Sequence, residues 1–254
     1  MKLSNKNFKA HANFIPSQHS YMRVLNKGGL TYTDSGFKSD TFNIIHIHDE
    51  NVILDDIKEG IDFIENRLRS ACIWLEEGHL TPQLKTNLDS LSYQNTDSSE
   101  MLSFELPADK EFDVHPNINR VKEKQEIIDH AFVIANNWEP FDVEVLHYYN
   151  RSAEVILNQN KSLLYNYFDG EAVIGVIELF IDPEDETVAG IYNLSVLKEH
   201  RNKGIGMLLI QHVLYTAKIL GVKKIVTQAS DESMKLFGRI GFEEMGKIME
   251  FGKK

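Results

Sequence analysis

The chain of 254 residues is long enough to bury two modest cores, and its 42% hydrophobic and 26% charged residues are ordinary for a water-soluble globular protein. The formal net charge of −11 argues against a protein that binds mainly nucleic-acid phosphates, and it suits a cationic small substrate better. Because Cys72 is the single cysteine, an intramolecular disulfide is excluded. No apolar run is long enough to span a bilayer, and the N-terminal residues lack the apolar core of a signal peptide. We therefore expect a cytoplasmic protein without a membrane partner.

The first third of the chain alternates expected strands and helices. Four segments are strand candidates: residues 30–34, 41–49, 71–76 and 100–106. A helix is predicted over residues 55–68, because four apolar side chains recur there at spacings of three and four: Ile57, Ile61, Ile64 and Leu68. A second helix is predicted to begin at Thr81-Pro82, since proline is favoured in the first helical turn.

The later part of the chain opens with two expected helices, over residues 126–138 and 142–159. Two strands, at residues 162–168 and 171–181, flank Asp169-Gly170, a pair that favours a hairpin turn. Further elements are expected in chain order: a strand at 189–197, a helix at 206–220, a strand at 223–229, a helix at 231–240 and a last strand region. This order predicts an α/β (α+β) fold with an antiparallel start and strand–helix–strand crossovers.

A charged stretch with two prolines, residues 107–124, separates these two parts. We therefore expect one domain over residues 1–106 and another over residues 107–254. Residues 81–93 and 230–242 also align without gaps, each with a polar start, a helical pattern and a final small residue followed by an aromatic one. Together with the matching order of elements, this echo indicates that the first domain is a shortened relative of the second.

The stretch EHRNKGIG, residues 199–206, lies between an expected strand and an expected helix. Amides in the first helical turn have no intrahelical acceptor and lie at the positive end of the helix dipole, so this turn can hold an anion. Gly204 and Gly206 would let a pyrophosphate approach the backbone, and Arg201 and Lys203 add positive charge. The alternative is a plain strand-to-helix turn with two solvated cations. The stretch fits neither the dinucleotide fingerprint nor the nucleoside-triphosphate loop.

Residues 201–206, RNKGIG, resemble motif A of the GNAT superfamily of acyl-CoA-dependent N-acyltransferases, whose pattern is [Q/R]xxGx[G/A] between a strand and a helix. The resemblance covers the second part of the chain as far as the helix that ends at Gly241-Phe242. It implies two tandem GNAT-like domains, each a mixed sheet flanked by helices, with a degenerate N-terminal domain. The corresponding N-terminal loop, DENVILDD at residues 49–56, has no glycine and four carboxylates, which should repel a pyrophosphate.

The resemblance further implies acetyl-CoA as the cosubstrate and no metal. Three strand residues would pair with the pantetheine arm through their backbone groups: Leu194, Ser195 and Val196. The loop would hold the pyrophosphate through its amides: Arg201, Asn202, Lys203, Gly204, Ile205, Gly206 and Met207. Ser230 and Ser233 would present side chains to the same cofactor. Phe237 takes the position at which many family members have a tyrosine that protonates the leaving thiolate.

Acyl transfer to an amine benefits from a base, and Glu178 is the candidate because it is a carboxylate in the otherwise apolar stretch VIGVIELFI. The equally weighted alternative is an outward residue on a half-exposed strand. Many family members carry a carboxylate on the cofactor strand itself, where this chain has Ile191-Tyr192-Asn193. Because Phe237 cannot donate a proton, Tyr192 is the candidate acid.

Two functions follow from the resemblance. The first is an N-acetyltransferase that moves an acetyl group from acetyl-CoA to a primary amine of a small molecule or peptide, by direct attack in a ternary complex. The alternative is a CoA-binding sensor or scaffold with weakened chemistry, and a third possibility is that the motif match is accidental and CoA is not bound. His46 and His48 share a strand face but have no identifiable third ligand, so no metal site is expected.

Overall fold

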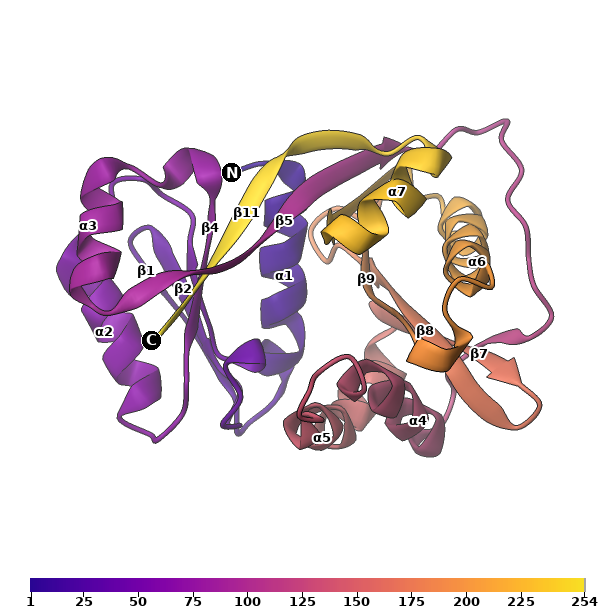
Figure 1. Cartoon of the computed structure of the whole chain (residues 1–254), viewed down its shortest axis with the longest axis horizontal. Coiled ribbons are helices and arrows are strands. Elements are labelled where there is room, and N and C mark those ends of the chain that lie inside the picture. Colours follow the sequence, from indigo (N-terminus) through magenta and orange to yellow (C-terminus); the bar gives the residue numbers. More distant parts are fainter. Residues whose placement is uncertain (254) are drawn as a thin grey trace. The chain divides into compact units, whose positions relative to one another are not determined.

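The computed structural model describes residues 1–253, which form two compact units (Figure 1). Unit 1 contains Met1–Leu102, Gln228–Met234 and the residues from Glu244 onward, and unit 2 contains Ser103–Thr227 and Lys235–Glu243. Each unit combines a sheet with flanking helices, so the predicted α/β fold class is confirmed.

Unit 1 is built on a sheet whose strands lie in the order β1, β2, β3, β4, β11 and β5. β3 and β4 are parallel, whereas the pairs β1–β2, β2–β3 and β4–β11 are antiparallel. The strands have these bounds: β1 Arg23–Lys27, β2 Leu30–Asp34, β3 Ile44–Ile47, β4 Cys72–Glu76, β5 Tyr93–Glu105 and β11 Glu243–Lys253.

Helices cover both faces of the unit 1 sheet (Figure 1). Their bounds are α1 Leu3–Gln18, α2 Leu54–Glu65 and α3 Pro82–Ser90, with short 3-10 turns η1 at Asp40–Phe42 and η2 at Glu77–His79. Because side chains alternate along a strand, Ile45 and Ile73 join the core beneath α2 and α3. His46 and Trp74 face the other side, where Phe8 of α1 contacts both rings.

The helix predicted over residues 55–68 ends earlier than expected. α2 ends at Glu65, and Leu68, which we expected on its apolar stripe, is 88% exposed with a φ of +59°. The amide of Leu68 bonds to the carbonyl of Glu65 in a tight turn, which directs the side chain outward. The predicted start of α3 is confirmed, since Thr81 Oγ1 accepts a hydrogen bond from the Leu84 amide at 3.1 Å.

Unit 2 holds the later strands in the order β10, β9, β8, β7 and β6, all antiparallel to their neighbours except the parallel pair β9–β10. In Figure 1, α4 and α5 lie on one side of β7 and β8, and α6 lies on the other. The strands are β6 Ile118–Arg120, β7 Ser162–Asp169, β8 Ala172–Ile181, β9 Val188–Val196 and β10 Lys224–Ala229. The helices are α4 Lys124–Ala135, α5 Val143–Gln159, η3 Lys198–His200 and α6 Ile205–Ile219, together with α7 Asp231–Ile240, which lies in unit 2 from Lys235 onward.

Two local signals in unit 2, the cap of α5 and the β7–β8 turn, act as the sequence predicts, and the structure adds a close contact at Gly175. Asp142 accepts a hydrogen bond from the Glu144 amide at 2.9 Å and caps α5. Gly170 has a φ of +61° in the turn that joins β7 to β8. Gly175 of β8 allows close helix packing, because a Cβ there would lie 2.9 Å from Ile205 and 3.2 Å from Leu209 of α6.

The final strand departs from the domain limits that we expected. Residues 107–254 were expected to form one domain, but the structure places Gln228–Met234 and residues 244–253 in unit 1. The reason is strand pairing: β11 runs antiparallel to β4, with Ile248 opposite Glu76 and Phe251 opposite Ile73. No helix among residues 1–253 is both long and apolar enough to cross a membrane.

Candidate active site

A bulge in β9 shapes the centre of unit 2. Val176 of β8 pairs with Ser195, and Glu178 pairs with Tyr192, so Asn193 and Leu194 together face the single residue Ile177. Asn193 adopts a φ of +54°, the left-handed conformation that asparagine tolerates better than most residues. A bulge of this kind bends its strand and re-aims the side chains around it.

The bulge lies where β9 is no longer paired with β10. The parallel ladder joins Lys224 to Val188 and Val226 to Gly190, and in the described part of the chain it does not continue beyond that pair. β9 itself continues to Val196. The three residues expected to pair with pantetheine, Leu194 to Val196, therefore lie on a strand segment beyond the ladder, where an extended chain can be added.

The loop after β9 leads into the first turn of α6. Asn202 and Gly204 have φ values of +61° and +83°, and Gly204 is the N-cap residue. The Leu208 amide makes the first hydrogen bond into the helix, to the Gly204 carbonyl at 3.1 Å, which leaves the amides of residues 205–207 in the first turn. A Cβ at Gly204 would meet no atom within 4 Å, so an anion can approach there.

The two glycines of this loop have different roles. We expected both to open the backbone to a phosphate, but a Cβ at Gly206 would lie 3.2 Å from the Leu236 side chain. Gly206 therefore permits close packing of α6, and only Gly204 faces open space. Lys203 is exposed.

Arg201 connects the loop to its surroundings. Its Nε donates to the Val196 carbonyl at 3.0 Å, and its Nη2 donates to Asn137 Oδ1 at 2.9 Å. Asn137 Nδ2 in turn donates to Ser195 Oγ at 2.7 Å. This network joins the α4–α5 connection, the end of β9 and the loop. Asn137 was not predicted, because no local sequence signal links it to residues that lie far along the chain.

Glu178 is buried, with 2% of its surface exposed, so the alternative of a half-exposed outward residue is wrong. Ser162 Oγ donates to Oε1 of this carboxylate, and Asn193 Nδ2 donates to Oε2 at 2.8 Å. Asn193 Nδ2 also lies 3.0 Å from the hydroxyl of Tyr149 on α5. The bulge thus places Asn193 as a bridge between the carboxylate and a phenol.

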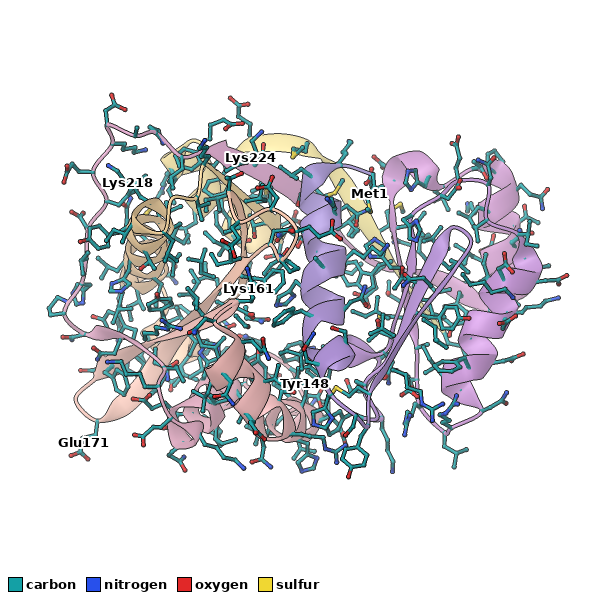
Figure 2. All side chains as sticks on the ribbon, turned by 180° about the vertical axis from the view of Figure 1, so that it is seen from behind. Met1, Tyr148, Lys161, Glu171, Lys218 and Lys224 are labelled. Carbon is teal, nitrogen blue, oxygen red and sulfur yellow. The ribbon has the colours of Figure 1, made fainter. Side chains whose placement is uncertain are left out.

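Two tyrosines of this cluster are buried and neutral. Burial raises the pKa of Tyr192 well above its ordinary value, and the negative charges of Glu178 and Asp182 raise it further. Burial, then Glu178 and Tyr148, raises the pKa of Tyr149 in the same direction. Tyr148 of α5, which is labelled in Figure 2, contacts Tyr149 edge-on, with ring centroids 5.8 Å apart. The Tyr192 and Tyr149 phenols therefore keep their protons near neutral pH.

His130 of α4 was not predicted as part of the site. Its side chain is buried, and burial lowers its pKa to about 4, although a hydrogen bond with Asn166 and the charge of Glu178 act in the opposite direction. Asn166 Nδ2 donates to the Glu126 carbonyl, which leaves its Oδ1 to accept from His130 Nδ1 at 2.8 Å. The ring centroid lies 5.9 Å from that of Tyr149. Within residues 1–253, His130 Nε2 has no hydrogen-bond partner.

The remaining candidates lie at α7. Ser230 and Ser233 belong to unit 1, and Ser233 Oγ donates to the Ser230 carbonyl at 3.1 Å. Phe237 belongs to unit 2, is 2% exposed and packs edge-on against Phe242, with ring centroids 5.0 Å apart. Phe237 therefore contributes to the core and brings no hydroxyl to the site.

The two histidines expected to share a strand face, His46 and His48, belong to unit 1. His46 is buried, and burial lowers its pKa to about 3, while His48 is partly exposed. Among the described residues, no group of three or more histidine, cysteine, aspartate or glutamate side chains is arranged to hold a metal ion.

Residues 125–242 match the sequence profile of the acetyltransferase (GNAT) family. A search of curated proteins gives no significant match to the chain. The fold is similar to that of a GCN5-related N-acetyltransferase from Kribbella flavida, at 14% identity and a TM-score of 0.69, over 100% of this chain and 96% of that chain. It is also similar to a conserved protein of unknown function from Staphylococcus epidermidis, at 15% identity and a TM-score of 0.65, over 93% of this chain and 96% of that chain.

A third similar structure is a tandem GNAT protein from the clavulanic acid biosynthesis pathway, at 10% identity and a TM-score of 0.58, over 98% of this chain and 95% of that chain. At these identities the structures show a shared fold. The profile match is confined to residues 125–242, and the similar structures show that the chain shares the fold of GNAT proteins.

Proposed function

We propose that the protein is an N-acetyltransferase that moves the acetyl group of acetyl-CoA to a primary amine by direct attack in a ternary complex. The observation that carries this proposal is the arrangement around β9. Its last residues extend past the ladder with β10 and lead to the first turn of α6, where Gly204 leaves open space. Glu178 of β8 pairs with Tyr192 of the same strand. The strand with its helix turn would by itself favour only cofactor binding, and Glu178 by itself would favour no particular reaction.

The pantetheine arm would pair with the backbone of Leu194 to Val196, in the manner of an added strand. The pyrophosphate would meet the amides of residues 201–207 at the start of α6, where Gly204 leaves space. Bound acetyl-CoA supplies the acetyl group as a thioester.

Glu178 is the proposed base. An amine with a pKa near that of lysine is neutral in only about one molecule in 2,500 at pH 7, a cost of roughly 4.6 kcal/mol. A carboxylate held by two hydrogen bonds at a fixed place can accept the proton that the amine loses, directly or through a water. Tyr192 lies opposite Glu178 in the register and keeps its proton, so it is the proposed donor to the leaving thiolate.

A second candidate function is a CoA-binding sensor or scaffold with weak chemistry. Phe237 supports it, because the resemblance to GNAT proteins aligns this buried residue with the tyrosine that protonates the thiolate in many family members. A thiol has an ordinary pKa near 8.5 and leaves tolerably as a thiolate, and a positioned acid contributes typically ~10² to 10⁴ in rate. The loss of that tyrosine therefore slows turnover without abolishing it.

Unit 1 is proposed to be a degenerate relative that does not bind CoA. Its parallel pair β3–β4 is joined along all of β3, from Ile44 opposite Cys72 to Ile47 opposite Leu75, so no strand segment is left for an added chain. The segment that follows β3 carries four carboxylates: Asp49, Glu50, Asp55 and Asp56. These charges would repel a pyrophosphate.

The acceptor is proposed to be a small-molecule or peptide amine, and the net charge of −11 favours a cationic one. The test is thiol release from acetyl-CoA in the presence of polyamines, aminoglycosides, amino acids and peptide N-termini. Amine-dependent release supports the enzyme. Cofactor binding without release for any amine would support the sensor instead.

A further inference from the structure

An open pocket of about 220 Å³ lies in unit 2, and its lining includes no residue of the loop or the bulge. It is formed where β6, the start of β7 and the end of α5 meet. Its volume corresponds to about seven water molecules in the liquid, which is enough for a small organic molecule. The lining residues are Arg120, Val121, Lys122, Ile156, Leu157, Asn160, Ser162 and Leu164.

The floor of the pocket is apolar. Val121, Ile156 and Leu164 are all buried, at 7%, 5% and 2% exposure, and their side chains offer only aliphatic surface. Ser162 is the one buried polar residue of the lining, and its hydroxyl already donates to Glu178. The floor therefore suits a short aliphatic chain rather than a polar group.

The rim of the pocket is cationic. Arg120 and Lys122 are exposed, and neither forms an ion pair with a carboxylate in residues 1–253. Arg120 donates to the neutral Oδ1 of Asn160 at 2.6 Å, which holds the guanidinium at the edge of the pocket and leaves other N–H donors available. The neighbouring carboxylate of Glu126 accepts from the amides of Lys122 and Glu123, so it is engaged in capping α4.

Arg120 and Lys122 are the charged side chains of the lining, and three negative groups outside the lining act against them: the C-terminus of α5 and the carboxylates of Glu126 and Glu178. A helix C-terminus carries roughly half a negative charge, whereas the two side chains carry two full positive charges. The cations outweigh the helix end, and they stand out in a chain whose net charge is −11. Because the lining contains two cationic side chains and no carboxylate, an anion that enters the pocket meets positive charge at its rim.

We propose that this pocket is a binding site for a small aliphatic carboxylate, with the carboxylate at Arg120 and Lys122 and the chain against Val121, Ile156 and Leu164. A planar guanidinium suits a carboxylate because its N–H groups match the two oxygens. The lining contains none of the residues proposed to hold acetyl-CoA, although Ser162 connects the pocket to the proposed base through its hydrogen bond to Glu178, and binding of the carboxylate does not require acetyl transfer.

The test is an NMR titration of the ¹⁵N-labelled full chain with hexanoate, which combines one carboxylate with a five-carbon tail. The account predicts saturable shifts that are largest at the amides of Val121, Leu157 and Ser162. Hexanol and acetate, which lack the charge and the tail respectively, should each bind at least fivefold more weakly. The proposal would be overturned if no amide shift saturates at hexanoate concentrations up to about 50 mM, a range that detects even very weak binding. It would also be overturned if the largest shifts belong to amides away from the pocket.

A pair of variants tests the cations. Arg120→Gln combined with Lys122→Gln should weaken hexanoate binding at least fivefold, because both charges lie at the rim. Lys124→Gln is the matched control, since this exposed residue is two positions away and does not line the pocket. The ¹⁵N spectrum itself reports whether each variant is folded. Equal weakening by the control would show that general charge, and not the pocket, attracts the ligand.

Discussion

Replacing Glu178 by glutamine tests the proposed base with little change in shape. The wild-type carboxylate accepts from Ser162 Oγ and from Asn193 Nδ2. Glutamine can keep its oxygen toward Asn193 and turn its amide toward Ser162, whose hydroxyl can rotate to accept. The variant should therefore fold with a melting temperature near that of the wild type, while it loses the group that accepts a proton.

The expected loss in kcat at pH 7 is about 10²- to 10⁴-fold, the range for removal of a general base. Without the base, the reaction depends on the free amine, and the rate should rise about tenfold per pH unit until the pKa of the acceptor is approached. Thiol release, measured from pH 6 to pH 10 with the best acceptor, gives both the magnitude and the profile.

Glu171→Gln is the matched control, because Glu171 is exposed and projects from the tip of the β7–β8 hairpin (Figure 2). It removes the same charge from the same hairpin and should leave kcat within about twofold, as surface changes usually do. A Glu178→Gln enzyme that keeps wild-type kcat at pH 7 and a wild-type pH profile would refute Glu178 as the base.

Three further predictions concern the same unit. Tyr192→Phe should lower kcat by at least about 10²-fold if the phenol donates the proton, and unchanged thiol release would end that assignment. Gly175→Ala should destabilise unit 2 by about 1–3 kcal/mol through overpacking against Ile205 and Leu209, and an unaltered melting temperature would contradict this. His130 has a folded pKa of about 4, below its unfolded value, so its contribution of about 3 kcal/mol is present above pH 6.5 and is lost as the pH falls toward 4. Urea titrations at several pH values should therefore give a shallower loss of stability for His130→Gln, and an equal slope would count against the assignment.

Local signals predicted most of the helices and strands, but they missed α1. Its sequence is polar, and the residues that it buries include Ser4, Asn5 and Asn7 rather than an apolar stripe. Asn5 Nδ2 donates to Glu76 of β4 at 2.9 Å, so part of what holds this helix is a long-range polar contact. Periodicity of apolar residues cannot reveal a helix that is held in this way.

In the candidate site, too, local signals predicted some features, while others depend on contacts between distant parts of the chain. The positive φ at Gly204 follows from a glycine before an expected helix, which is a local signal. The bulge at Asn193 and the burial of Glu178 depend on the register between β8 and β9, and a single strand does not reveal its register. The partner of the last strand was also beyond local reasoning, since its own residues do not indicate that β11 pairs with β4.

The most direct test of the account is a calorimetric titration with acetyl-CoA. Gly204→Glu places a carboxylate at the proposed phosphate position. Gly221→Glu is the matched control, because Gly221 follows the other end of α6 and has a φ of +80°, close to the +83° of Gly204. A Cβ at either glycine would meet no atom within 4 Å. The account predicts that the wild type and Gly221→Glu bind with similar affinity and that Gly204→Glu binds at least about tenfold more weakly, a difference of roughly 1.4 kcal/mol. Absence of binding by the wild type at millimolar acetyl-CoA, or equal affinity of both variants, would contradict it.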